Sequence, residues 1–363
     1  MEILIYIILN FGLSWEYKSS RALALGGVGV ALKDPQTSFF LNPAAMRGTK
    51  SLDIISLEIQ ISESIISSVS KVSLLSDIFS GEDFTISDIK DFLGKGYGAN
   101  IYYFPHFIVS VNNVSFGLGI LSGLGIGLKP SVSSNITLTD TFFLTGALPV
   151  LGGAFSIVDN SVEIGVSLVP FEAAAISRFE LRENEVLSFQ KIFPAFSKEP
   201  GDILNDIIES NCTYPLDCAF GFGGFNLGVI WNPVWVKGFS VGIDARDIAD
   251  PIRKTTADFG ISYMGKLYNV RYSLFLDFQD FIFTQSGRSD IATHIFFGSE
   301  LNFGIPSIQR FISVMLGVGQ MNLSAGLELN LKVISFTIGT FAQELRSYIG
   351  ASSIRYYFFK LAI

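Results

Sequence analysis

The most regular stretch of the chain is residues 321–333, where apolar and polar residues alternate without a break. The apolar positions are Met321, Leu323, Ala325, Leu327, Leu329, Leu331 and Val333, and between them lie Asn322, Ser324, Gly326, Glu328, Asn330 and Lys332. A period of two places these sets on opposite faces of one extended strand. At about 3.3 Å per residue the stretch spans roughly 43 Å, whereas strands of globular proteins usually have about 5–6 residues. A tilted strand needs ~9–11 residues to cross a bilayer, so the pattern predicts a membrane-spanning strand.

The same alternation recurs along most of the chain. Further alternating stretches run through residues 51–61, 97–111, 114–129, 137–147, 162–168, 219–231, 239–244, 256–263, 268–279, 294–303, 312–318 and 355–363. The fold class predicted is all-β, a transmembrane antiparallel β-barrel of about 12–14 strands. A closed sheet satisfies every backbone group in a medium that offers no water.

Several charged or titratable residues of the C-terminal third lie on the polar face of these strands. They include Arg271, Asp277, His294, Glu300, Glu328 and Lys332. Since a Lys or Arg that faces lipid costs about 2–4 kcal/mol at mid-depth, we expect these residues to line the lumen. Mixed charge of this kind favours a satisfied network over a catalytic cluster.

Composition agrees with a barrel and excludes several classes. The chain is 49% hydrophobic with a mean hydropathy of +0.44, yet after residue 13 it has no apolar run of the ~18 residues that a spanning helix requires. The net charge of −8, without a Lys/Arg cluster, argues against a nucleic-acid partner. No pattern in the chain calls for a cofactor or a metal.

The ends and the insertions divide the chain. Residues 1–14 have an apolar core of the length of a signal-peptide h-region, although Glu2 stands where a basic residue is usual. Residues 15–50 precede the barrel, which we assign to residues 51–363. Two polar insertions, near residues 62–96 and 179–218, are expected outside the membrane on the extracellular side, where long connections of such barrels lie. The second holds Cys212 and Cys218, which in an oxidising compartment form a small disulfide or remain two unpaired thiols.

Residues 15–50 do not alternate, and they carry a resemblance. The run Arg-x-x-x-Leu-Gly-Gly-x-Gly-Val-Ala-Leu, then Asp-Pro and Asn-Pro-Ala-Ala, resembles the N-terminal segment of FadL-type long-chain fatty-acid transporters and their PorV-type relatives. The matching positions are Arg21, Leu25, Gly26, Gly27, Gly29, Val30, Ala31, Leu32, Asn42, Pro43 and Ala44. Residues 257–263, 297–301 and 340–345 echo terminal strands of the PorV-type family. The resemblance implies a plug, or hatch, inside an outer-membrane barrel.

Pro105 interrupts an otherwise alternating strand. Proline cannot donate to the ladder, so it marks a bulge, a kink or an edge. In the FadL-type family a kinked early strand opens a lateral gap in the wall, and the resemblance makes Pro105 the candidate for it here. An ordinary bulge is the alternative.

Two functions follow from the resemblance. The first is a bacterial outer-membrane channel that moves hydrophobic, fatty-acid-like molecules past the plug, with the bilayer and that small molecule as its partners. The second is a PorV-like scaffold or shuttle whose external insertions hold secreted or surface proteins. An enzyme is not expected, because the Gly-x-Ser-x-Gly spelling at residues 238–242 lies within a strand rather than on a strand-to-helix turn.

Overall fold

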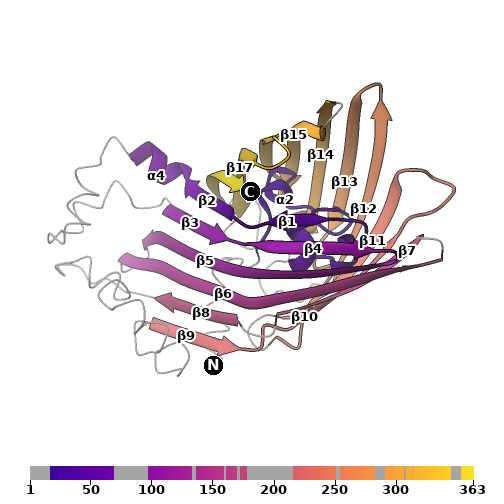
Figure 1. Cartoon of the computed structure of the whole chain (residues 1–363). Helices are drawn as coiled ribbons and strands as arrows, with labels where there is room; N and C mark the ends of the chain where they lie inside the picture. The colour runs from indigo at the N-terminus through magenta and orange to yellow at the C-terminus, as the bar shows by residue number, and fades with distance from the viewer. Residues whose placement is uncertain are drawn as a thin grey trace.

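The protein folds as a closed antiparallel β-barrel (Figure 1). The computed structural model describes residues 17–68, 97–132, 136–158, 161–169, 172–177, 216–250, 254–282, 291–305, 308–344 and 353–363. The strands are β1 (Ser51–Asp53), β2 (Ser56–Ser62), β3 (Tyr97–Tyr103), β4 (His106–Val111), β5 (Val114–Val132), β6 (Ile136–Ile157), β7 (Val162–Leu168), β8 (Glu172–Ser177), β9 (Leu216–Gly221), β10 (Phe225–Trp231), β11 (Phe239–Ile248), β12 (Thr256–Leu267), β13 (Val270–Phe278), β14 (Ile295–Ile305), β15 (Ile308–Gly319), β16 (Asn322–Asn330), β17 (Ser335–Glu344) and β18 (Ser353–Ala362). The helices are α2 (Ser20–Ala24), α3 (Thr37–Phe40) and α4 (Glu63–Ser68), with 3₁₀ turns η1 (Pro43–Met46) and η5 (Ile291–His294).

Fourteen barrel strands arise from these eighteen segments, because four barrel strands are each split in two. β3 and β4 keep one register against β5, and β7 and β8 keep one register against β6. β1 with β2, and β9 with β10, are the other split strands. The circle closes where β18 pairs with β2. The predicted strand number of 12–14 is confirmed at its upper end.

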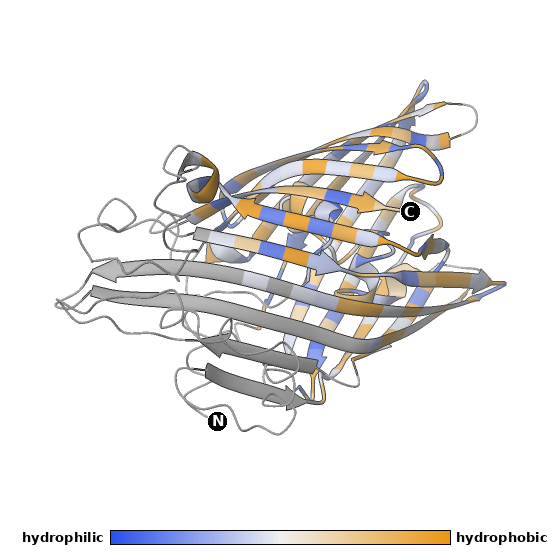
Figure 2. Ribbon diagram, turned by 60° about the vertical axis from the view of Figure 1, so that its left-hand side comes forward, coloured by the Kyte–Doolittle hydropathy of each residue, from blue (hydrophilic) through white to orange (hydrophobic). Residues whose placement is uncertain are grey.

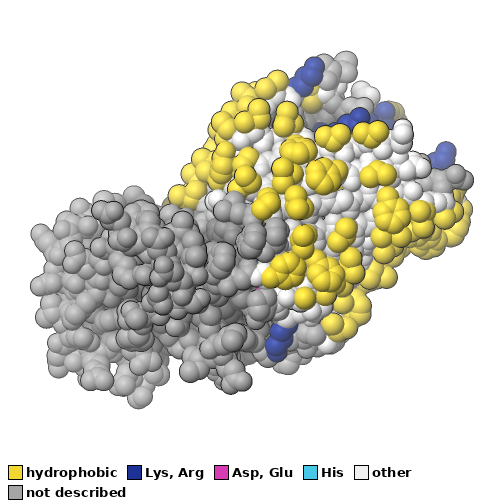
Figure 3. Space-filling model, turned by 60° about the horizontal axis from the view of Figure 1, so that its bottom comes forward, with side chains coloured by type: hydrophobic (Ala, Val, Ile, Leu, Met, Phe, Trp, Pro, Cys, Tyr) yellow, Lys and Arg dark blue, Asp and Glu magenta, His cyan; other side chains and the backbone are white. Residues whose placement is uncertain are grey.

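The alternating residues of the sequence lie on the inner and outer faces of the barrel wall. Along β16 the side chains of Leu323 and Leu327 are 69% and 45% exposed, whereas Ser324 and Glu328 are buried. Figure 2 shows the same alternation as hydrophobic and hydrophilic bands along neighbouring strands, and Figure 3 shows hydrophobic side chains spread over the outer wall. An apolar outer face with polar residues turned inward is the arrangement of a membrane barrel.

The strand predicted at residues 321–333 is shorter in the structure than the alternating stretch of the sequence. Residues 321–333 form β16 over Asn322–Asn330, with turns at both ends. Met321 and Lys332 have φ angles of 61° and 78°, which belong to turns and not to strands. Lys332 is therefore exposed in the connection between β16 and β17 and does not line the lumen as predicted. Polar-apolar alternation continued past the strand ends by chance, and no Gly or Pro marked the turn.

Several sequence-based predictions concern residues that the structure does not describe. These are the signal peptide at 1–14 and most of both insertions. α4 begins the first insertion, and β9 begins at Leu216, so the second insertion ends earlier than residue 218. Cys218 lies in β9 opposite Ala175, while Cys212 falls outside the described residues, so their bonding stays a prediction.

Across the described ranges, no helix is long and apolar enough to span a membrane.

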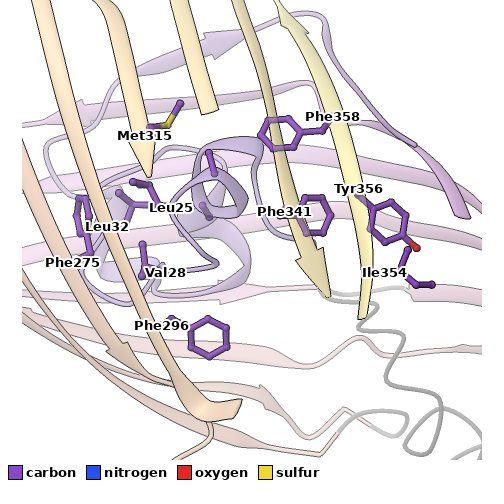
Figure 4. Packing of buried hydrophobic residues seen from close by; sticks show 12 residues of the cluster. Leu25, Val28, Leu32, Phe275, Phe296, Met315, Phe341, Ile354, Tyr356 and Phe358 are labelled. Carbon is purple, nitrogen blue, oxygen red and sulfur yellow. The ribbon is translucent and has the colours of Figure 1, made fainter. Parts of the chain in front are cut away.

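Residues 17–50, here called the inner segment, lie within the barrel (Figure 1). Figure 4 shows Leu25, Val28 and Leu32 of this segment among inward-pointing side chains of the wall. Those wall residues, which include Phe275, Phe296 and Met315, form one buried cluster with the inner segment. The inner segment thus completes the core that the barrel lumen would otherwise lack.

Candidate functional site: the inner segment and the wall that holds it

A chain of ion pairs ties the inner segment to three adjacent strands. Arg21 of α2 contacts both carboxylate oxygens of Glu300 in β14, with Nη2 2.5 Å from Oε2 and Nε 3.3 Å from Oε1. Arg310 of β15 lies 2.8 Å from Glu300 and 2.8 Å from Glu328 of β16. The Arg21 Nη1 also donates to the Lys33 carbonyl at 3.1 Å. Two predicted lumen residues, Glu300 and Glu328, therefore hold the inner segment directly or through Arg310.

The electrostatics of the inner segment reflect this arrangement. Burial alone would lower the pKa of Arg21, but Glu300 and Asp34 raise it above its ordinary value. Burial alone would raise the pKa of Asp34, but Arg21 and Lys360, together with hydrogen bonds from Thr37, lower it to about 2. Both groups are thus held in their charged forms inside the barrel.

Charge complementarity extends around the wall. The inner segment has five basic residues and one acidic residue, and Lys33 pairs with Glu163 of β7 at 2.7 Å. Asp277 of β13, another predicted lumen residue, accepts backbone hydrogen bonds from Gly29 at 2.6 Å and Val30 at 3.0 Å. A carboxylate thereby satisfies two backbone donors in a segment that has no strand partner.

Asn42, Pro43 and Ala44 form a compact turn against the wall. The Asn42 Oδ1 accepts from the Ala44 backbone at 3.1 Å and caps η1, in which Pro43 is the first residue. The Asn42 Nδ2 donates to the Val30 carbonyl at 2.7 Å, which joins the two halves of the inner segment. The Asn42-Pro43 dipeptide, which from sequence alone indicates an ordinary turn, thus connects two parts of the inner segment by hydrogen bonds.

The wall beside the inner segment is built from glycine. Gly26, at φ +82°, begins the irregular chain after α2. Its carbonyl occupies the space that a Cβ on Gly319 would need, and the backbone of Leu25 and Gly26 does the same at Gly317. The same backbone-on-glycine contact recurs at Gly165, Gly242 and Gly298, whereas at Gly228 the Asn42 and Pro43 side chains fill the space. At these other glycines the inner segment touches the wall with its main chain.

Polar side chains complete the attachment. Lys18 donates to Gln279 at 2.8 Å, and Gln279 donates to the Gly27 carbonyl at 2.8 Å. His294 lies at the end of η5 rather than in a strand, and its Nδ1 is 2.8 Å from the Gln279 carbonyl. On the other side, Lys360 contacts Gln36 at 2.6 Å.

The inner segment meets β3–β6 in a different way, mainly through apolar side chains. Phe39 and Met46 pack with Phe104, Ile108, Leu121 and Val150 in a second buried cluster that also includes Tyr17. The Phe39 ring stands edge-on to Phe104 with centroids 5.5 Å apart. Here side chains of the inner segment fill the space above wall glycines, with Phe39 over Gly117 and Met46 over Gly152.

Pro105 separates β3 from β4, and the wall is paired on both sides of it. The Phe104 amide donates to Ser56 of β2 at 2.9 Å, and the Ile120 amide donates to the Pro105 carbonyl at 3.0 Å. Against β1 and β2 the register shifts by one residue at this point. The proline therefore lies at a bulge, as the alternative interpretation expected, and a lateral gap here remains a proposal.

Arg271 keeps the inward parity of β13 but is exposed near the start of that strand. The residues that sequence reasoning missed are mainly the wall glycines and the partners of Lys18, Lys33 and Gln36. One signal was present for the glycines, which recur on the polar parity of successive strands.

Two solved structures resemble this barrel over nearly their whole length. The toluene transporter TbuX of Ralstonia pickettii matches with a TM-score of 0.54 at 11% identity, covering 96% of this chain and 98% of that one. The toluene transporter TodX of Pseudomonas putida matches with a TM-score of 0.51 at 8% identity, covering 96% and 97%. The chain has the fold of these transporters. No protein-family model and no curated protein sequence matches it.

Proposed function

We propose that the protein is an outer-membrane channel for hydrophobic small molecules, which pass the inner segment without a chemical step. One observation carries the proposal: a barrel with an apolar outer face encloses a segment that meets part of the wall mainly through apolar side chains. A passage for hydrophobic molecules needs an apolar lining. Transfer of such a molecule from water is favourable only when the surface that it enters is apolar.

The fold likeness supports the same class of function. TbuX and TodX are toluene transporters, and their barrels have the same architecture as this one. We propose fatty-acid-like or similarly apolar cargo, with the inner segment as the plug. The cargo enters from the end with long connections and leaves through the wall near Pro105, beside the cluster around Phe39 and Phe104.

The test is uptake by vesicles that contain the purified barrel and carry lipopolysaccharide in the outer leaflet, which slows hydrophobic solutes. Labelled toluene, a labelled long-chain fatty acid and labelled glucose serve as an aromatic, an aliphatic and a polar probe. We expect faster uptake of at least one hydrophobic probe than in vesicles without protein, and no change for glucose. Equal uptake with and without protein would refute the proposal.

The PorV-like scaffold makes the opposite prediction for the external insertions. If the protein is a channel, shortening residues 69–84 leaves uptake intact. If it serves as a scaffold, hydrophobic uptake is absent in the full chain, and capture of a secreted protein depends on the insertions.

A further inference from the structure

The structure points to a way for the passage to open, an inference that rests on the proposed transport. We infer that Phe39 and Met46 form a side-chain gate, so that cargo passes between the inner segment and β4–β6 while the backbone of the segment stays in place. The inference follows from how each sector of the lumen is filled.

On β7, β11, β14 and β15 the filling is main chain. The backbone of the inner segment lies where Cβ atoms of Gly165, Gly242, Gly298 and Gly317 would be. Main chain in such contact cannot move aside without shifting the whole segment. Ion pairs on Glu300 and Glu163 hold the same sectors, so no route opens there by a local change.

Around Gly117 of β5 and Gly152 of β6 the filling is side chain. Gly117 and Gly152 are direct partners across β5 and β6, so their missing side chains leave a single notch in the wall. The Phe39 ring end lies over Gly117, and the Met46 thioether lies over Gly152. The walls of the notch are apolar, with Ile108, Leu121 and Val150 around it.

The backbone beneath these two side chains is fixed independently. The Phe39 carbonyl accepts from Ser167 at 2.7 Å and from Asn226 at 3.4 Å. After Met46, the Thr49 carbonyl accepts from Ser110 of β4 at 2.6 Å, and the Arg47 side chain donates to Ser156 of β6 at 2.9 Å. Rotation of the two side chains therefore breaks none of these bonds. Methionine, with three rotatable bonds, is suited to such adaptation.

The experiment separates side-chain rotation from displacement of the inner segment. A reducible bis-methanethiosulfonate cross-link between Lys33→Cys and Glu163→Cys, in a Cys212→Ser/Cys218→Ser background, locks the segment to β7. The Lys33 Nζ and the Glu163 Oε1 lie 2.7 Å apart in the native pair, so a short flexible linker takes the place of the two side chains without placing a new atom against the backbone of the inner segment. We expect the locked barrel to retain hydrophobic uptake into the vesicles described above. Loss of uptake that returns on reduction would overturn the gate in favour of whole-segment movement.

Alanine variants test the gate residues themselves. Met46→Ala should speed uptake by roughly five- to thirtyfold, the factor expected when ~1–2 kcal/mol of packing no longer has to be broken. Phe39→Ala should act in the same direction. Leu32→Ala is the matched control, since it removes a buried side chain of similar size on the opposite side of the segment. Equal acceleration in Leu32→Ala would indicate general loosening and refute the gate. Absence of uptake in the wild-type barrel would instead refute the proposed transport.

Discussion

Removal of the Arg21 guanidinium should loosen the inner segment while the barrel stays folded. In Arg21→Met the aliphatic stem is largely kept, but Glu300 loses the two contacts that it receives from Arg21. Lys50→Met is the matched control, because it removes the same charge from an exposed position at the end of the segment.

The magnitude follows from what Glu300 retains. Stripping one partner from an isolated buried ion pair costs about 3–5 kcal/mol. Glu300 keeps Arg310 at 2.8 Å, so the cost should fall below that range, to roughly 2–3 kcal/mol. That loss corresponds to a roughly 30- to 150-fold larger population of the open inner segment.

Hydrogen exchange followed by mass spectrometry in lipid nanodiscs measures this population. Peptides that cover residues 20–34 should exchange faster by about that factor in Arg21→Met. In Lys50→Met their exchange rate should equal that of the wild type. Peptides from β14–β16 should keep their protection. If residues 20–34 exchange at the wild-type rate in Arg21→Met, or if the barrel strands lose protection as well, the ion-pair chain is not what holds the inner segment.

Three further variants test separate parts of the account. Gly317→Ala places a methyl group against the backbone of Leu25 and Gly26 and should destabilise docking of the segment by ~1–3 kcal/mol. Gly153→Ala is the control, because its methyl group meets one neighbouring atom at 3.7 Å and should leave docking unchanged. The hydrogen-exchange rate of residues 20–34 measures the difference between the two variants. Because the pKa of Asp34 is lowered to about 2 from 3.8, its ionised form stabilises docking by about 2 kcal/mol above roughly pH 4, and this contribution is lost as the pH falls through 2. Pepsin cleavage within residues 17–50 should therefore be faster in Asp34→Asn than in the wild type at pH 4, and the difference should vanish near pH 1.5; a difference that persists there would contradict the assignment. Leu327→Lys should lower the free energy of unfolding by roughly 2–4 kcal/mol in urea titrations of the vesicle-bound barrel. If the loss is no larger than that caused by Asn330→Lys on the other face, Leu327 does not face lipid.

The barrel could be predicted from the sequence because its physical basis is local. Each residue of a strand faces either lipid or the lumen, so a period of two appears directly in the order of residues. Leu327 and Glu328 lie on the faces that their positions predict. The end of β16 was missed, since a turn at Leu331–Ile334 needs no Gly or Pro when Lys332 adopts a positive φ.

The site was predicted less completely, because it depends on contacts between distant residues. Arg21, Asn42 and Asp277 were identified as candidates, but their partners lie as many as 279 positions away in the sequence. The role of Gly317 likewise depends on which backbone lies against it. Alternation identifies the residues that face inward and gives no information about which inward residues meet.

The most direct test of the account is a spin-label scan along β16, from Leu323 to Leu329, in lipid vesicles. Labels at Leu323, Ala325, Leu327 and Leu329 should collide readily with dissolved oxygen, which concentrates in the bilayer, and poorly with a water-soluble nickel chelate. Labels at Ser324, Gly326 and Glu328 should collide poorly with oxygen. A period of two with this phase is the predicted result, and no periodicity or the opposite phase would contradict a lipid-facing barrel wall around an inner segment.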